Sequence, residues 1–292
     1  EEAVNLVQGK LKYTNDITFS SSSLLNKFGY TYNKSQRSFI QQLLKIQSFD
    51  EVKSKIEELK KLKVLVVGET IVDQYVFCEA LGKSGKEPVL VLRDLKMEQY
   101  SGGAAAIARH LSDFCGTISL LSMLGEKKEH EAFVLNSLPN NIKPYFIYKE
   151  ASPTIIKKRY VDYITQNKSL GVYSINDSPM NVENQDQLNA YLDDLISKHD
   201  LMIISDYGHG FISRETAKNI SRQTIYTCLN AQINAANIGY HTMNNYQDID
   251  CAIINETELR HELRDRESSV GTLMKQLTIR QRAKNLVVTQ GS

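Results

Sequence analysis

The sequence of 292 residues predicts an α/β fold with a mainly parallel sheet, and two observations carry this prediction. From Lys63 onward, short apolar runs of β type alternate with segments of helical periodicity, which is the pattern of βαβ units. Runs such as Val64–Val67 and Leu201–Ile204 are apolar throughout, as strands buried on both faces are. We therefore expect one α/β domain over residues 63–292.

The elements of this domain are predicted in order from their periodicity and their turn residues. Strands are expected at Val64–Val67, Val89–Leu92, Lys96–Tyr100, Ile118–Met123, Tyr145–Tyr148, Thr154–Ile164, Gly171–Ile175, Leu201–Ile204, Ile225–Leu229, Cys251–Ile254 and Leu286–Thr289. Helices are expected at Ala104–Phe114, Glu129–Leu138, Val182–His199, Ser213–Arg222 and Leu273–Ala283. Ser213 is predicted to cap its helix, because a serine hydroxyl accepts from the free N–H groups of a first turn.

The N-terminal part differs from the rest. Residues 35–62 are predicted as a helical linker, since Phe39, Leu43 and later Val52 and Ile56 recur at helical spacing. Residues 1–34 combine a strand-like piece, a hydroxyl cluster and a short apolar helix. The expected organisation is therefore 1–34, 35–62 and 63–292.

Composition excludes several classes of function. The formal net charge is +1, which gives no support for a nucleic-acid-binding or membrane-binding surface. The four cysteines are scattered without a CxxC pair, so we expect free thiols in a reducing cytoplasm rather than a zinc site. No apolar run approaches the ~20 residues that cross a bilayer.

Four short motifs follow strand-like runs: Gly68-Glu69-Thr70-Ile71-Val72-Asp73, Gly102-Gly103-Ala104-Ala105-Ala106, Ser205-Asp206-Tyr207-Gly208-His209-Gly210 and Asn255-Glu256-Thr257-Glu258. Open α/β sheets bind ligands at the carboxyl ends of their strands. We therefore expect the four motifs to meet in one cleft.

The first two motifs suggest contacts to a polyol. An ionised Asp73 can only accept hydrogen bonds, as sugar hydroxyls require, although a turn cap is an equal alternative. Gly102 and Gly103 would let backbone approach a ligand at a helix start, and ordinary helix-opening glycines are the alternative.

The remaining candidates are polar or charged. Asp206 could orient a substrate or a metal-bound water, or simply cap a turn. Asn255 and Glu258 would share one face of a helix and offer oxygens to Mg²⁺, or they would be a plain acidic first turn. Arg159 could reach an anionic substrate, whereas exposed charge on an edge strand is the alternative.

Taken together, the motifs resemble those of the ribokinase-like PfkB carbohydrate kinases over about residues 63–292, most closely the heptose-phosphate kinase half of bifunctional ADP-heptose synthases. The Gly-Asp-x-x-x-Asp, Gly-Gly-Ala-Ala-Asn, Ser-Asp-Tyr-x-Lys-Gly and Asn-x-x-Glu motifs of those enzymes are similar to the four motifs above. Residues 83–88 fall where that family has a small β lid, and 287–292 resemble the strand leading to its nucleotide site.

This resemblance implies a three-layer α/β/α domain with a β lid, and ATP and Mg²⁺ as cofactors. Asp73, Gly102, Gly103, Arg159 and Asp206 would bind a sugar or sugar phosphate. The residues expected to serve the nucleotide are Asn255, Thr289 and Gly291, with Glu258 at the metal. The lid strands would form a homodimer contact.

Three residues depart from the family pattern: Ala106 replaces a sugar-binding Asn, His209 replaces Lys, and Asn230 lies where Asp-Pro-Lys is common. The family's Gly-Ala-Gly-Asp segment, which holds the catalytic base and the anion hole, is absent from the sequence. We expect that base beyond Ser292, and we expect this chain alone to be inactive.

Residues 17–25 resemble the Ile-Ser-Thr-Ser-x-Leu-type tail of nucleotidyltransferases, and a hydroxyl-rich helix cap is the alternative. The sequence thus predicts an ATP-dependent sugar or sugar-phosphate kinase of sugar-nucleotide biosynthesis. The parent protein would combine this kinase with a nucleotidyltransferase. The alternative is a kinase-like binding or assembly module without catalysis. A Rossmann dehydrogenase is disfavoured, because no Gly-x-Gly-x-x-Gly follows the first strand.

Overall fold

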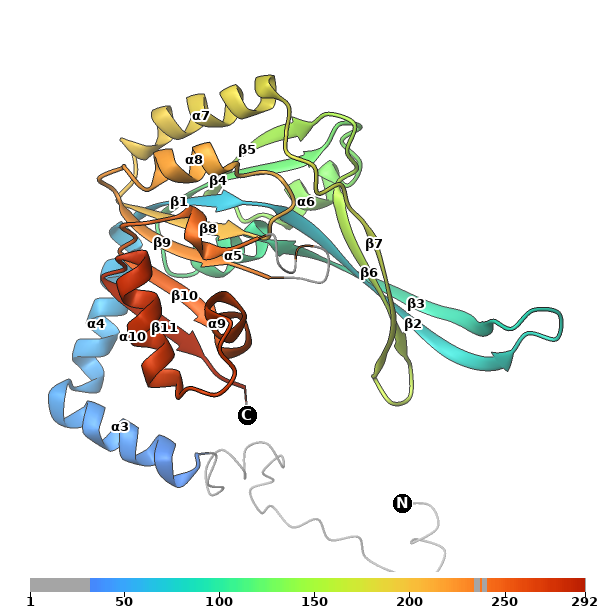
Figure 1. Cartoon of the computed structure of the whole chain (residues 1–292), viewed down its shortest axis with the longest axis horizontal. Helices are drawn as coiled ribbons and strands as arrows, with labels where there is room; N and C mark the ends of the chain where they lie inside the picture. Colours follow the sequence, from blue (N-terminus) through green and yellow to red (C-terminus); the bar gives the residue numbers. More distant parts are fainter. Residues whose placement is uncertain (1–31, 234–236, 238–240, 292) are drawn as a thin grey trace, which may run out of the picture. The chain divides into compact units, whose positions relative to one another are not determined.

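The computed structural model describes residues 32–233, 237 and 241–291 (Figure 1). The chain divides into two compact units, one ending at Lys55 and the other beginning at Ile56. The N-terminal region that resembles a nucleotidyltransferase tail, residues 17–25, lies outside the described residues. No helix in the described ranges combines the length and the apolar character that a membrane span needs.

The predicted 35–62 helix is two helices. α3 (Lys34–Ile46) ends where Gln47 adopts extended backbone, and α4 (Phe49–Glu58) runs into a 3₁₀ turn at Leu59–Lys61. Ser48 starts the second helix, because its hydroxyl accepts from the Glu51 N–H at 3.2 Å while its own N–H donates to the Glu51 carboxylate at 2.7 Å. This reciprocal pair is a capping box, which the helical spacing of the apolar residues concealed.

The second unit is built on a seven-stranded sheet in the order β11-β10-β9-β8-β1-β4-β5, in which every neighbouring pair is parallel. Its strands are β1 (Lys63–Gly68), β4 (Thr117–Gly125), β5 (Ile142–Lys149), β8 (Leu201–Asp206), β9 (Tyr226–Ala231), β10 (Cys251–Asn255) and β11 (Asn285–Thr289). The predicted parallel sheet is confirmed, and so is a strand at each of these seven predicted positions.

Helices cover both faces of this sheet (Figure 1). They are α5 (Ala104–Ser112), α6 (Glu131–Ser137), α7 (Val182–Ile196), α8 (Arg214–Ile220), α9 (Glu256–Leu263) and α10 (Val270–Gln281). Of these α9 was not predicted as a full helix. Ser213 caps α8, as predicted, by accepting the Thr216 N–H at 3.1 Å.

The core consists of two layers because successive residues of a strand face opposite sides. Leu65 and Val67 of β1 belong to the cluster that contains α7, α8 and α10 residues. Val64 and Val66 belong to a second cluster with Ala104 and its neighbours in α5. The three-layer arrangement that the resemblance implied is therefore present.

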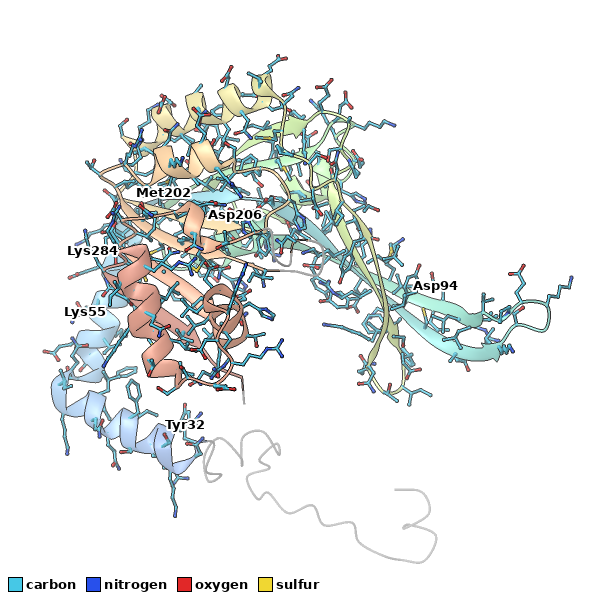
Figure 2. The ribbon with its side chains drawn as sticks, viewed as in Figure 1. Tyr32, Lys55, Asp94, Met202, Asp206 and Lys284 are labelled. Carbon is cyan, nitrogen blue, oxygen red and sulfur yellow. The ribbon has the colours of Figure 1, made fainter. Side chains whose placement is uncertain are left out.

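The lid is a separate four-stranded sheet in the order β3-β2-β6-β7, whose hairpins project from the rest of the unit (Figure 1). Its strands are β2 (Thr70–Lys83), β3 (Leu90–Gly103), β6 (Ile155–Asp162) and β7 (Lys168–Ser174). Figure 2 shows Asp94 on the projecting part, whereas Met202 and Asp206 lie inside the main body.

Two expectations about the lid were wrong. The short strands predicted at Val89–Leu92 and Lys96–Tyr100 are one strand of 14 residues, and β2 was not predicted at all. The β2–β3 register shifts at Phe77/Cys78 and again at Ala80/Gly82, so these bulges interrupt the alternation that identifies strands. Much of both strands is also exposed, which weakens the apolar signal.

Gly68 lies where β1 approaches β8 closely, so a substitution at Gly68 tests how tightly these two strands must pack. A Cβ at Gly68 would lie 2.0 Å from the Ser205 carbonyl oxygen. We expect Gly68→Ala to lower the free energy of unfolding by about 1–3 kcal/mol, because backbone must move to relieve the overlap.

The matched control is Gly271→Ala, whose new Cβ would meet no atom within 4 Å. Because Gly271 is helical, this change should raise stability by up to about 0.5–1 kcal/mol. Urea unfolding followed by circular dichroism measures both. Equal effects of the two substitutions would contradict the close approach of β1 and β8.

Candidate active site

The four sequence motifs meet at one edge of the parallel sheet. Register pairs Gly68 with Ser205 at the ends of β1 and β8, and Asn255 with Thr289 at the ends of β10 and β11. The chain runs from β1 to β4 on one side and continues from β8 to β11 on the other, so strand order reverses at β1. Such switch points are where open α/β sheets bind ligands.

The two glycines of the second motif pack directly on the first motif. A Cβ at Gly102 would lie 2.3 Å from the Asp73 carboxylate, and one at Gly103 would lie 2.2 Å from the Glu69 carbonyl oxygen. Gly103 also has φ of +61°, which disfavours any side chain. These glycines therefore bring the backbone against Asp73 and position the start of α5.

Asp73 and Arg159 form an ion pair between β2 and β6, and their side chains are only 24% and 20% exposed. The Arg159 guanidinium lies over the rings of Tyr75 and Tyr173, 5.5 and 6.0 Å from their centroids. β6 is an inner strand of the lid, so the alternative of edge-strand charge is wrong. Two predicted site residues are thus brought together.

Lys157 is a further cation beside Asp73, and it was not among the predicted site residues. It is the register partner of Asp73 on β6, and its ammonium lies 5.6 Å from the ring centroid of Tyr207 and 6.0 Å from that of Tyr173. Burial lowers the pKa of Lys157, and the Asp73 carboxylate opposes this shift. Its spacing of two from Arg159 on a strand is the signal that could have identified it.

A cavity of about 450 Å³ opens on this face of the lid beside Asp73. Its wall consists of Asp73, Tyr75, Phe77, Glu98, Tyr100, Val161, Gln166 and Lys168. Aromatic faces next to a carboxylate and other polar groups suit a polyhydroxylated ring, which has both C–H faces and hydroxyls.

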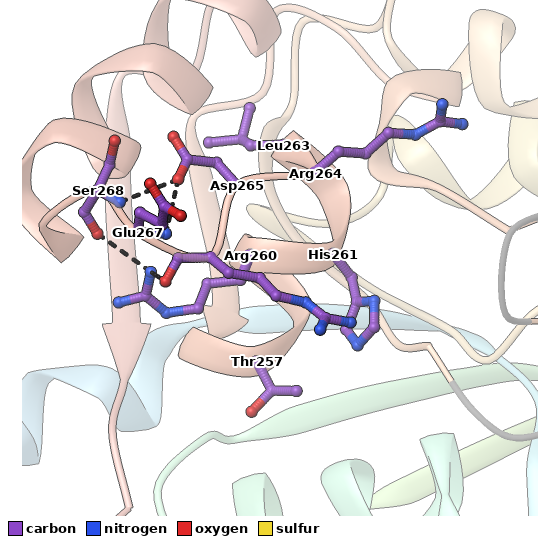
Figure 3. Close-up of a pocket in the computed structure, with 9 residues that line it drawn as sticks. Thr257, Arg260, His261, Leu263, Arg264, Asp265, Glu267 and Ser268 are labelled. Atoms are coloured by element: carbon purple, nitrogen blue, oxygen red, sulfur yellow. Dashed lines mark hydrogen bonds between the residues drawn. The ribbon is translucent and has the colours of Figure 1, made fainter.

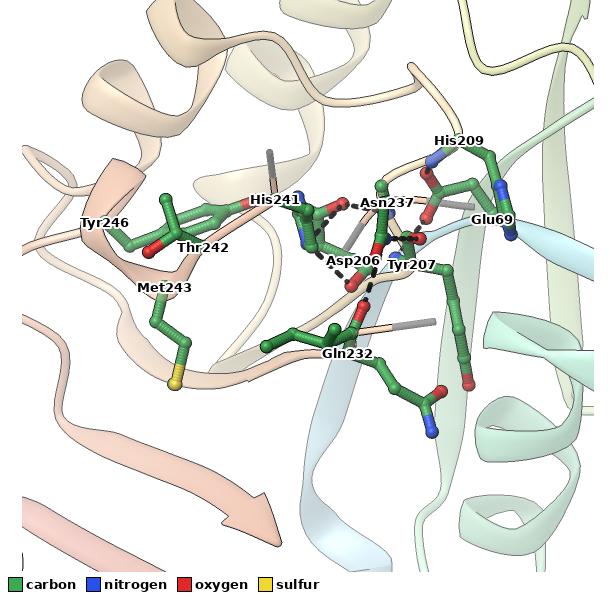
Figure 4. Close-up of polar contacts among 12 residues, drawn as sticks. Glu69, Asp206, Tyr207, His209, Gln232, Asn237, His241, Thr242, Met243 and Tyr246 are labelled. Carbon is green, nitrogen blue, oxygen red and sulfur yellow. Dashed lines mark hydrogen bonds and ion pairs between the residues drawn. The ribbon is translucent and has the colours of Figure 1, made fainter. Parts of the chain in front are cut away.

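Asp206 is placed inward rather than toward a ligand. It is 2% exposed, and its two carboxylate oxygens accept the Gly208 N–H at 2.9 Å and the Tyr246 hydroxyl at 2.7 Å (Figure 4). Burial raises the pKa of Asp206 to about 6, and these two hydrogen bonds oppose the increase. This is the turn-capping geometry that the sequence left open as the alternative.

His209 stands where the resembled kinases have Lys, and it is completely buried. Its Nδ1 lies 2.6 Å from an Asp177 carboxylate oxygen, and its carbonyl oxygen accepts the Lys149 ammonium at 3.0 Å. Within the ranges that the structure describes, His209 Nε2 has no hydrogen-bond partner. Neither Lys149 nor Asp177 was recognised from sequence, because both lie outside any motif.

Tyr207 connects the two ends of the site electrostatically. Burial raises the pKa of its phenol, and the carboxylates of Glu69, Asp73 and Glu258 add to that increase. Carboxylates on the β1–β2 side and on α9 therefore both raise the pKa of the same phenol.

Asn255 and Glu258 form a capping box at the start of α9. The Glu258 N–H donates to Asn255 Oδ1 at 2.8 Å, and the Asn255 N–H donates to Glu258 Oε2 at 3.1 Å. Glu258 Oε1 accepts the Ile233 N–H at 3.3 Å, and burial raises the pKa of Glu258. Thr289 ends the neighbouring strand β11, Gly291 lies two residues further along the chain, and both are exposed.

A second hollow, of about 1060 Å³, lies beside α9 and the segment that follows it (Figure 3). None of the predicted site residues lines it. Arg260 in its wall is already bonded to Glu256 and to the carbonyl oxygens of Arg266 and Ser268. Of the residues in the four motifs, Asp73 lines the lid cavity and Thr257 lines this second hollow. We take the Asp73 face as the candidate site, because the ion pair of Asp73 with Arg159 lies there.

The sequence profile of the family described as pfkB family carbohydrate kinase matches residues 61–292. The chain belongs to the pfkB family of carbohydrate kinases. Among the solved structures, this pfkB-family chain is similar to the tetrameric inhibited form of phosphofructokinase-2 from Escherichia coli, with a TM-score of 0.59 and 15% identity over 79% of this chain and 74% of that one. It is also similar to Arabidopsis thaliana ribokinase complexed with ribose and ATP, with a TM-score of 0.53 and 16% identity over 80% and 73%.

The curated relatives of this pfkB-family chain include the bifunctional protein HldE. The Haemophilus influenzae protein is 30% identical over 153 residues, which are 52% of this chain and 31% of the relative. The Campylobacter jejuni protein is 27% identical over 164 residues, 56% of this chain and 34% of the relative. The chain thus spans about a third of the length of these relatives. The predicted fold and family are confirmed.

The raised pKa of Asp206 predicts how the stability of the folded chain depends on pH. Because the folded chain holds the Asp206 proton up to about pH 6 and the unfolded chain releases it near 3.8, stability is lost as pH rises through this interval. Asp206→Asn removes the buried charge and keeps an acceptor for Gly208. Relative to wild type it should gain about 2–3 kcal/mol in unfolding free energy between pH 4 and 7.

Asp265→Asn is the control, because N–H groups of Ser268 and Glu267 lower the pKa of this exposed carboxylate. Its removal should change the pH dependence with the opposite sign. Urea unfolding at several pH values measures both. A wild-type pH profile in Asp206→Asn would show that Asp206 is ionised throughout.

Proposed function

We propose that this domain transfers the γ-phosphoryl group of ATP to a hydroxyl of a sugar phosphate, as a step of sugar-nucleotide biosynthesis in the cytoplasm. The observation that carries this proposal is the Asp73–Arg159 pair beside Lys157 on one face of the lid. A carboxylate accepts hydrogen bonds from sugar hydroxyls, whereas guanidinium and ammonium groups bind phosphate oxygens. Both requirements of a sugar phosphate are therefore met by neighbouring side chains of β2 and β6.

In this proposal Asp73 receives the sugar, and Gly102 keeps the backbone close to it. Arg159 and Lys157 bind the phosphate, and the Tyr75 and Tyr173 rings hold the guanidinium in place. Arrival of the phosphate gives Arg159 a second anionic partner. Catalysis comes chiefly from positioning and charge neutralisation, as phosphoryl transfer requires.

The nucleotide is proposed to bind at the ends of β10 and β11, near Asn255, Thr289 and Gly291. The donor set there fits Mg²⁺ in an outer-sphere arrangement: each Glu258 carboxylate oxygen accepts one backbone N–H and retains a second lone pair for a metal-bound water. Mg²⁺ would neutralise charge on the phosphates. In the described part of the chain, no cluster of three or more His, Cys, Asp or Glu forms a closed metal cage.

The parent protein is proposed to combine this kinase with a nucleotidyltransferase. Support comes from the bifunctional relatives, of which this chain spans about a third, and from the tail-like sequence at residues 17–25. A homodimer through the lid is proposed as well, because the lid exposes Leu90, Leu95 and Leu170.

One observation favours a second function, that of a kinase-like binding module. The His209 ring is buried against Asp177, so it cannot act on a ligand as an extended Lys would. Ala106 likewise offers no side-chain contact to a sugar. The two functions differ in nucleotide binding: isothermal titration with ATP and Mg²⁺ should give a saturable heat for the kinase and none for the module.

The sugar-phosphate proposal is tested with Arg159→Gln. Fructose 6-phosphate and sedoheptulose 7-phosphate are the probes, with fructose and sedoheptulose as their unphosphorylated counterparts. We expect at least one phosphorylated probe to raise the melting temperature, since ligand binding stabilises the folded state by mass action. Arg159→Gln should weaken that binding about 10- to 100-fold, because it removes a charge-assisted hydrogen bond of roughly 1.5–3 kcal/mol.

Lys158→Gln is the matched control, since it removes the same charge from the same strand but from its other face. It should leave the shift unchanged. Equal shifts with phosphorylated and unphosphorylated sugars, or equal losses in the two variants, would refute phosphate recognition by Arg159.

A further inference from the structure

Glu69 is a completely buried carboxylate at the point where β1 passes into β2. Its Oε2 accepts the Tyr207 N–H and its Oε1 accepts the His209 N–H, both at 2.9 Å (Figure 4). Its own carbonyl oxygen accepts the Ala104 N–H at 2.8 Å, at the start of α5. One residue of the first motif therefore bonds to two other motifs.

The loop that Glu69 holds has the form of an anion-binding nest. The N–H groups of Tyr207, Gly208 and His209 are successive, and all three donate to carboxylates: the first and third to Glu69, the second to Asp206. Gly208 and Gly210 have φ of +69° and +85°, which turns the backbone so that its N–H groups point inward. Such concavities bind anions, and here the anion belongs to the protein.

The same loop is held from its other side by a cation. Lys149 is 2% exposed and donates to the His209 carbonyl oxygen at 3.0 Å. Burial lowers the pKa of Lys149, and the carboxylates of Glu69 and Asp177 oppose that shift. Burial and the Asp206 carboxylate raise the pKa of Glu69, and its hydrogen bonds from the N–H groups of Tyr207 and His209 oppose that shift.

We propose that Glu69 is the positioning residue of the acceptor site, because it holds the loop of Tyr207 and His209 against the motifs that contain Asp73 and Gly103. The identity of the acceptor that this site binds rests on the proposed function. The connection between Glu69 and the loop of Tyr207 and His209 rests on the geometry alone. A glutamine has one carbonyl oxygen in place of the two carboxylate oxygens, so it cannot reproduce both hydrogen bonds of Glu69.

The test is amide hydrogen exchange of the full chain, followed by mass spectrometry at residue resolution. Glu69→Gln and Glu69→Ala should each speed exchange at Tyr207 and His209 at least tenfold, with no change in β4 or β5. Sodium formate at 100 mM should restore protection in Glu69→Ala, because a small carboxylate can re-enter the vacated nest.

Glu262→Gln is the matched control. Glu262 is another buried carboxylate, and it accepts the Met243 N–H at 3.1 Å and the Thr242 hydroxyl at 2.6 Å. Its substitution should speed exchange near Met243 and leave Tyr207 and His209 protected, with no response to formate. Unchanged exchange at Tyr207 and His209 in both Glu69 variants, or a uniform increase over the whole sheet, would overturn the proposal.

Ligand binding separates this proposal from the proposed function. With a sugar phosphate that raises the melting temperature of the wild-type chain, Glu69→Gln should weaken binding of that sugar phosphate about tenfold and leave the affinity for ATP within twofold. A wild-type chain that binds none of the sugar phosphates would count against the proposed function, while the exchange and formate results would still decide whether Glu69 holds the loop.

Discussion

The candidate site depends on the bond between the Glu69 carboxylate and the N–H groups of Tyr207 and His209. This bond joins the ends of β1 and β8, the two strands at which the order of the sheet reverses. A buried carboxylate is costly unless its hydrogen bonds are complete, so the loop and the carboxylate each require the other. Asp206 and Lys149 complete the network from either side.

The lid adds the charged face that distinguishes this site from a plain sugar pocket. β2 continues directly from the Glu69 turn, so Asp73 is tied to the same network through four residues of strand. β6 then lies beside β2 and brings Arg159 and Lys157 next to Asp73. The proposed recognition of a sugar phosphate thus follows from the pairing of two strands that are 86 residues apart at the Asp73–Arg159 contact.

Much of the fold followed from local patterns, and the failures have physical causes. Buried parallel strands such as β1 and β8 are apolar at every position, so they were recognised directly. The long lid strands carry two bulges and exposed surfaces, so they resembled short pieces or turns. The break between α3 and α4 depended on the Ser48–Glu51 capping box, which the apolar spacing did not reveal.

The amino-acid sequence by itself determined the α/β class, the family and the four motifs at strand ends, because each of these depends on short runs of contiguous residues. Only the tertiary structure decided what the motif residues contact: Asp206 turns inward to Tyr246, Arg159 pairs with Asp73, and Lys149 and Asp177 enclose His209. These contacts join residues far apart in the chain, and their energies depend on burial and on neighbouring charge. Neither quantity is defined until the strands have packed.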